Sequence, residues 1–471
     1  MVFAVVASAV GMSNLDLFVV NVALPAIGHD FRNSSLGTLS WVLNGYAIAF
    51  AALLVPFGRV ADRLGHRSGF LLGIVVFTGA SALCALCPSV GWLIGARVLQ
   101  AAGAALLVPT SLALLLAATP PERRQPMVRA WTAVGGAAAA LGPLLGGVLT
   151  QADWRWIFLI NVPVGVVCLT AGLRVLPKTE SKEGGPKPDL VGAALLTLAV
   201  GALALALVKV GDWGWGSAAF LISAAVTVAA VVLLVLQSNR HPAPVIETSL
   251  LRVRGFAAPT VAATLFTVAF AMMLLSIVLW CQQVLGYSSM LTGFAVAPGP
   301  LMVPILAFAV TPLAKRLGGT VKVAVLGIVA FAAGIVCWTL WADPVEPQYF
   351  AQVLPGMMLT GVGVGLTLPA LIGTAATVLP ANRFATGSAI IQMARQVGTV
   401  LGIAVLVSVL GGNSSLDAAA LPRFRTGWVV VIAVCVLAGA AALTRPAAKP
   451  AVAEPAPEPE PKASADPSDA R

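Results

Sequence analysis

The chain has 471 residues, of which 59% are hydrophobic and only 10% are charged, with a formal net charge of +10. Soluble domains carry about 25% charged residues, so this composition excludes an ordinary water-soluble protein. The positive charge does not indicate nucleic-acid binding, because most cations fall in short connections between apolar stretches, with no basic stripe among aromatic residues. We therefore expect an integral membrane protein surrounded by lipid, with no nucleic-acid partner.

The first apolar stretch, residues 3–27, contains a carboxylate near its centre, Asp16. At ~1.5 Å per residue, about 20 residues cross the hydrocarbon core, so Asp16 is expected near mid-depth. A charge there costs ~2.5–3.5 kcal/mol, and such residues usually face a protein-lined cavity on an ion or substrate path. No basic residue precedes the stretch, so we interpret it as a retained helix and not as a signal peptide. Asp16 predicts a transporter.

Apolar runs bounded by Gly, Pro or charged residues predict fourteen transmembrane helices. The expected spans are 3–27, 38–57, 69–87, 91–117, 127–149, 155–176, 190–210, 217–236, 258–283, 290–313, 321–341, 349–379, 385–410 and 426–444. Most of the 28 Lys and Arg residues fall in alternate connections on one side of the membrane. The opposite side has Arg32, Arg155, Lys209, Arg423 and Arg425. By the positive-inside rule, both termini are expected in the cytoplasm of a cell (plasma) membrane protein.

An internal repeat divides the chain into two halves. The motif Ala-Asp-Arg-Leu-Gly at 61–65 returns as Ala-Lys-Arg-Leu-Gly at 314–318, eight helices later in the same orientation. Parallel six-helix halves define the major facilitator architecture, with two extra helices between them here. The predicted fold is therefore an all-α polytopic membrane protein. Its expected units are an N-terminal six-helix bundle (1–176), a linker with two extra helices (177–257), a C-terminal six-helix bundle (258–445) and a disordered tail (446–471).

Four motifs resemble those of the fourteen-helix drug:proton antiporters of the major facilitator superfamily. They are Leu-Asp-Leu-Phe-Val-Val-Asn-Val-Ala-Leu-Pro at 15–25, Gly-Arg-Val-Ala-Asp-Arg-Leu-Gly-His-Arg at 58–67, Arg-Val-Leu-Gln-Ala-Ala-Gly at 97–103 and Gly-Pro-Leu-Leu-Gly-Gly at 142–147. The resemblance covers roughly residues 10 to 445. It implies a proton-coupled transporter that works by alternating access.

The resemblance gives Asp16 and Arg97 the role of proton coupling. Burial disfavours the charged form of a carboxylate and a nearby cation favours it, so an acid under both effects can exchange a proton during transport. A structural role remains the alternative for each residue. The family often has threonine two residues after the aspartate, where this chain has Phe18.

The second motif is expected to be a cytoplasmic gating loop between spans two and three. Its glycines permit a tight turn, and Asp62 can pair with arginines or cap a neighbouring helix. The residues assigned to this gating loop are Gly58, Asp62, Arg63, Gly65 and Arg67. A basic loop that only sets the topology is the alternative.

The fourth motif is expected to kink span five against a neighbour, because proline removes a helix hydrogen bond and glycines permit close packing. The resemblance to the drug:proton antiporters implies that this motif marks antiporters as opposed to importers. A helix face that serves only ordinary packing is the alternative. Its residues are Gly142, Pro143, Gly146 and Gly147. Further polar residues within spans are candidates for the substrate cavity: Asn21, Asn44, Tyr46, Gln100, Gln282, Gln392 and Arg395.

We interpret the chain as a proton-coupled antiporter that exports small amphipathic drugs or antibiotics, acting as a monomer on a small-molecule substrate and protons. An importer or proton-coupled metabolite symporter of the same fold is the main alternative. A membrane enzyme would need a cluster of catalytic or metal-binding residues near an interface, and the sequence suggests none, so we expect no enzymatic activity, cofactor or metal. A non-transporting sensor is a third alternative.

Overall fold

The computed structural model describes the chain except for residues 32–33, 178–186, 346–347, 380–383, 412–417 and 445–471. Within this described part, fourteen helices are long and apolar enough to cross a membrane, as the sequence predicted. The predicted tail, 446–471, lies outside the described residues.

The spans of the first half are α1 (Val2–Asp30), α2 (Leu36–Leu64), α3 (His66–Ala85), α4 (Val90–Ala117), α5 (Arg124–Ala152) and the pair α6 (Trp156–Leu159) and α7 (Asn161–Val175). Two helices follow, α8 (Leu190–Trp213) and α9 (Ala218–Arg240), and then the short α10 (Thr248–Leu251). The second half comprises α11 (Arg254–Leu279) with the π-helical turn Trp280–Val284, α12 (Ser289–Val296) with α13 (Pro298–Leu317), α14 (Thr320–Trp341), a π-helical turn (Tyr349–Val353) with α15 (Leu354–Thr377), α16 (Phe384–Leu410) and α17 (Leu421–Leu443).

Serine side chains cap the N-termini of several of these helices, close to the starts predicted from the sequence. Ser35, Ser89, Ser217 and Ser288 each accept a hydrogen bond from the backbone N–H three residues later. Such caps satisfy one of the N–H groups that the first helical turn leaves without an intrahelical partner. These serines therefore mark where four of the spans start.

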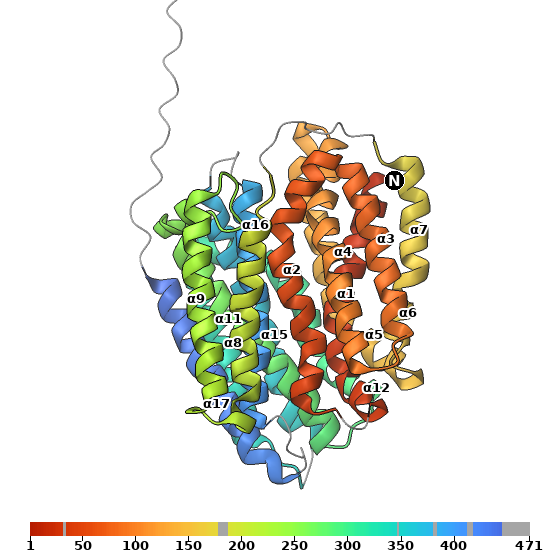
Figure 1. Ribbon diagram of the computed structural model, residues 1–471. Helices are drawn as coiled ribbons and strands as arrows, with labels where there is room; N and C mark the ends of the chain where they lie inside the picture. Colours follow the sequence, from red (N-terminus) through yellow and green to blue (C-terminus); the bar gives the residue numbers. More distant parts are fainter. Residues whose placement is uncertain (32–33, 178–186, 346–347, 380–383, 412–417, 445–471) are drawn as a thin grey trace, which may run out of the picture.

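The two halves share a packing pattern that supports the internal repeat. A methyl group added at Gly73 would lie 3.1 Å from the carbonyl oxygen of Gly103, and one added at Gly327 would lie 2.9 Å from that of Gly363. The pair α3–α4 therefore approaches as closely as the pair α14–α15 eight spans later. In Figure 1, the red and orange helices of the first half lie side by side with the green and blue helices of the second. Helix α8 contacts both α2 and α16, and thus both halves.

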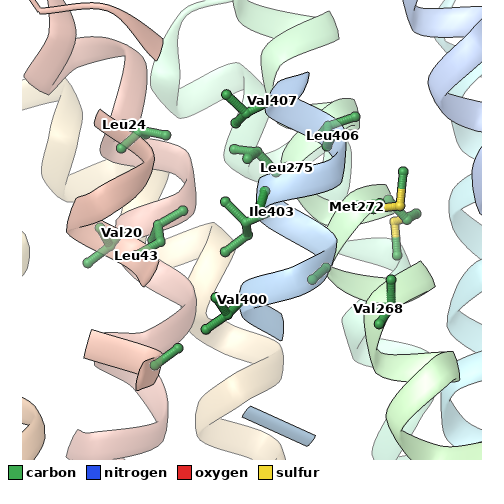
Figure 2. Close-up of a cluster of buried hydrophobic side chains, with 14 of the residues drawn as sticks. Val20, Leu24, Leu43, Val268, Met272, Leu275, Val400, Ile403, Leu406 and Val407 are labelled. Carbon is green, nitrogen blue, oxygen red and sulfur yellow. The ribbon is translucent and has the colours of Figure 1, made fainter. Parts of the chain in front are cut away.

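Three apolar clusters show where the halves meet. Because an even number of spans alternate in direction, α1 begins and α17 ends at the same end of the bundle, which we call the terminal end. One buried cluster contains residues of both halves and runs from Phe256 and Ile390 toward the terminal end to Leu24 and Val407 near the opposite end. Near that opposite end, Figure 2 shows Val20, Leu24 and Leu43 facing Ile403 and Val407 of α16. The buried members of the other two clusters come from one half each, the first from α1–α4 with α7 and Leu176, the second from α11–α17. The halves are therefore in direct apolar contact near the end opposite the termini, and we call this contact the seal.

Candidate functional site

A buried carboxylate cluster lies inside the first half, centred on Asp16. This residue is midway along α1, and only 1% of its surface is exposed. Its Oδ1 accepts hydrogen bonds from Gln100 Nε2 of α4 at 2.8 Å and from Asn161 Nδ2 of α7 at 3.0 Å. Its Oδ2 is paired with Arg97 Nη1 of α4. Three helices of one bundle therefore meet at a single side chain.

Arg97 is the other charged member of this cluster and is fully buried. Its Nη1 also donates to Gln100 Oε1 at 2.6 Å, and its Nε donates to the backbone carbonyl of Val42 in α2 at 3.3 Å. The guanidinium lies 4.2 Å from the centre of the Tyr46 ring, within the range of a cation–π interaction. Arg97 thus retains two contacts with α2 that do not depend on the charge of Asp16.

Ser81 of α3 connects the neutral members of the cluster. Its Oγ accepts from Gln100 Nε2 at 2.8 Å and from Asn161 Nδ2 at 3.4 Å, and it donates to the carbonyl of Phe77 at 2.8 Å. Five of the first-half spans, α1, α2, α3, α4 and α7, are thereby tied to one hydrogen-bonded network. A buried ion pair is expensive unless its remaining hydrogen-bonding groups are satisfied, and this network satisfies both oxygens of the carboxylate.

The sequence predicted part of this cluster. It related Arg97 to Asp16, and the structure brings these two residues together. It also named Tyr46 and Gln100 as candidates for the substrate cavity, and both lie in this buried cluster. Ser81 was missed, because a single serine in an apolar span has no distinguishing pattern. Asp16 itself is enclosed within the first bundle in this conformation.

The second motif is mostly helical, which corrects its expected placement in a loop. Helix α2 continues through Gly58 and Asp62 to Leu64, and the chain turns only at Gly65, whose φ of 83° favours glycine. Gly318 ends α13 at the matching place in the repeat with a φ of 74°.

The predicted gating residues lie at the terminal end. Asp62 is exposed and its Oδ1 lies 3.8 Å from His66 Nε2, so the expected pairing with an arginine is not formed in this conformation within the described part of the chain. Arg67 Nη2 donates to the carbonyl of Leu173 at 2.5 Å, joining α3 to α7 within the first half. Arg63 lies on the last turn of α2.

The fourth motif lies in close contact with two helices. A methyl group added at Gly142 would meet Phe18 Cβ at 2.5 Å, and one added at Gly146 would meet the carbonyl oxygen of Val19 at 2.9 Å, both on α1. One added at Gly147 would lie 2.6 Å from the carbonyl oxygen of Ser289, at the start of α12 in the other half. Helix α5 is continuous through Pro143. The motif therefore packs α5 between α1 and α12 at the sealed end.

The remaining candidates are scattered. Asn21 donates within its own helix to Leu17, and Gln282 donates to the carbonyl of Val22 at 2.9 Å, across the seal. Asn44 is fully buried, and neither its oxygen nor its nitrogen has a hydrogen-bond partner among the described residues. Gln392 and Arg395 bond each other on α16.

Comparison with known proteins identifies the family. The model of the Major Facilitator Superfamily matches residues 6–199, 189–402 and 305–469. The chain belongs to the major facilitator superfamily. It is 33% identical over 419 residues to the methylenomycin A resistance protein of Streptomyces coelicolor, covering 88% of this chain and 86% of that protein.

Two further relatives are resistance proteins by name. The chain is 34% identical to the multidrug resistance protein Stp of Mycobacterium tuberculosis (84% of this chain, 73% of the relative) and 30% identical to the probable multidrug resistance protein EmrY of Escherichia coli (86% and 79%). A solved structure from work on proton-dependent oligopeptide transporters superposes with a TM-score of 0.65 at 16% identity, covering 94% of this chain and 97% of that chain. This last likeness shows the shared fold. The protein is a multi-pass membrane protein of the major facilitator fold.

Proposed function

We propose that this superfamily member is a proton-coupled antiporter that exports small amphipathic drugs or antibiotics from the cell. The observation that carries the proposal is the buried network of Asp16, Arg97, Gln100, Asn161 and Ser81, because it connects a buried carboxylate to five helices. The resistance and export names of the relatives support the class of substrate.

The terminal end is the cytoplasmic end in this proposal, because most basic residues of the connections belong to it. We infer that the conformation described above is the one that is sealed toward the outside. The seal consists of the Gly147 contact with α12, the Gln282 bond to Val22 and the apolar contacts of Figure 2.

Protonation of Asp16 is the step that couples the gradient to the conformation. A neutral carboxylic acid accepts weaker hydrogen bonds than a carboxylate, so the bonds to α4 and α7 weaken when the proton binds. Arg97 keeps its contacts with Val42 and Tyr46 of α2, which hold it in place while its anionic partner is neutral. Because α1 also packs against α5, α11 and α12, its release from α4 and α7 alters how the halves meet.

The driving force is sufficient for such a cycle without a nucleotide. One proton moving inward releases ~2.3 kcal/mol per 100 mV of membrane potential, before any pH gradient is added. Asp62 acts at the cytoplasmic end in this scheme. It pairs with His66 when that end is open and gains partners on other helices when that end closes. We infer that a monomer suffices, since the network lies within one chain.

Purified protein in vesicles with an imposed pH gradient tests this function. A panel of cationic, neutral and anionic antibiotics would be added while the internal pH is followed with a fluorescent dye. Antiport predicts that a substrate dissipates the gradient and moves against the proton. Movement of substrate and proton in the same direction would instead establish a symporter, and no coupled flux with any compound would contradict the proposal.

A further inference from the structure

Helix α16 carries a polar stripe that the proton site does not use. Ser388, Gln392, Arg395 and Thr399 are spaced by four, three and four residues, so they share one face of the helix. All four are partly accessible, whereas Ile391 and Val400 beside them are buried. The stripe is therefore a polar, partly accessible surface on this helix, next to the buried Gln396, whose Oε1 has no hydrogen-bond partner among the described residues.

The neighbours of α16 show where this stripe points. Gly398 and Gly402 face α11, since methyl groups added there would lie 2.6 Å and 2.4 Å from the carbonyl oxygens of Thr264 and Val268. Ile403 faces the first half, as Figure 2 shows. At about 100° per residue, the stripe lies in the arc between these two directions. It consequently points between α11 and the first half, on the terminal side of Ile403.

Arg395 is the charged member of the stripe, and it has no carboxylate partner in the part of the chain that the structure describes. Its Nη1 donates to Gln392 Oε1 at 3.1 Å, and its buried Nε has no hydrogen-bond partner among the described residues. Asp16, the described carboxylate in the middle of a span, is already paired with Arg97. An intramembrane cation without a counter-ion is costly and usually marks a functional site.

An aromatic pair joins the two halves. Phe18 of α1 and Phe270 of α11 come from different halves, and their ring centres are 6.1 Å apart. Phe270 follows Val268 by two residues, and the carbonyl of Val268 lies against Gly402. Along α16, Gly402 is about two helical turns from Arg395. A cation and an apolar aromatic surface are thus arranged for a ligand with an acidic group at one end and an apolar body at the other.

Building on the export function proposed above, we propose that Arg395 and Gln392 bind the anionic group of the substrate, so that this protein exports amphipathic organic acids with a carboxylate or similar group. Arg395 donates from Nε and its terminal nitrogens to the acid, and Gln392 contributes its amide N–H. Export of a monovalent anion in exchange for one proton moves two charges in the same electrical sense. Export of such acids should therefore depend strongly on membrane potential.

A matched set of fluorescent probes tests this inference. Pyrenebutyrate, its methyl ester and pyrenebutyl-trimethylammonium share one apolar body and differ in charge, and their binding to full-length protein in lipid nanodiscs can be titrated by fluorescence. The wild type should bind the acid about tenfold or more tightly than the ester, the range expected for one charge-assisted hydrogen-bonded contact. Arg395→Gln should weaken the acid about tenfold and leave the ester unchanged, while Arg395→Lys should retain most of the preference.

Several outcomes would overturn the inference. These are equal binding of acid and ester by the wild type, tighter binding of the cation, or an equal loss for all three probes in Arg395→Gln. The last result would indicate a structural role, which the Arg395→Lys variant checks independently. If the cation is bound and exchanged for protons, the export function stands and only the acid specificity fails. If the acid binds through Arg395 but no probe moves under a proton gradient, the export function fails instead.

Discussion

The close contact of Gly147 with α12 predicts that a side chain at this position opens the seal. A methyl group there would lie 2.6 Å from the carbonyl oxygen of Ser289 and 2.9 Å from the Cα of Gly293. Both neighbours are backbone atoms, so the helices must separate. Overpacking of this kind costs about 1–3 kcal/mol. Since the contact exists only while the halves are sealed at this end, Gly147→Ala should shift the conformational equilibrium toward the outward-open state by about 5- to 150-fold.

Chemical labelling of the seal measures this shift. Ile403 is buried in the seal, so Ile403→Cys in a variant whose six native cysteines are replaced by alanine reports its opening to a membrane-impermeant maleimide from outside. Gly136→Ala is the matched control, because it lies on the same helix and a methyl group there meets nothing within 4 Å. Both variants gain the same helix propensity. Labelling should rise at least about fivefold in Gly147→Ala over Gly136→Ala, and equal labelling would refute the argument.

Three further predictions concern the first half. Arg97→Gln leaves the Asp16 carboxylate buried without a cation and should destabilise the protein by about 3–5 kcal/mol in thermal unfolding. The double variant that also carries Asp16→Asn should recover much of this stability. If it recovers none, the pairing of Asp16 with Arg97 is contradicted. Asp62→Asn removes only an exposed 3.8 Å contact with His66, so unfolding should be unchanged while transport slows, and unchanged transport would exclude the latch. Asn161→Leu removes a donor to Asp16 and should change the pH at which transport is half-maximal, a profile that a merely structural asparagine would leave in place.

The sequence was sufficient for most of the fold because a membrane limits the choices. Spans are set by length and apolarity, and the repeated Ala-Asp-Arg-Leu-Gly pattern located the matching turns, which Gly65 and Gly318 form in the structure. The sequence was not sufficient to predict the C-terminal end of α2. The polar residues from Gly58 to Leu64 suggest a loop on hydropathy alone, yet a helix that extends beyond the hydrocarbon can carry them on its surface.

The site was predictable only where a charge interrupts an apolar span. Asp16 and Arg97 were identified in this way, and the structure brings them together from helices 81 residues apart in sequence. Ser81 and the carbonyl of Val42 were not identifiable, since a serine in a transmembrane helix usually bonds its own backbone and a carbonyl has no sequence signal. The contact of Tyr46 with Arg97 was not predictable, because sequence does not show which face of α2 meets α4.

Proton release on substrate binding shows whether Asp16 couples the proton to the drug. Wild-type protein and Asp16→Asn would each be titrated, in weakly buffered detergent solution, with a drug that the protein binds. The pH change would be recorded together with the binding isotherm. We expect the wild type to release protons when the drug binds, while Asp16→Asn binds the drug and releases none. Equal proton release by both proteins would contradict the assignment of Asp16 as the coupling residue.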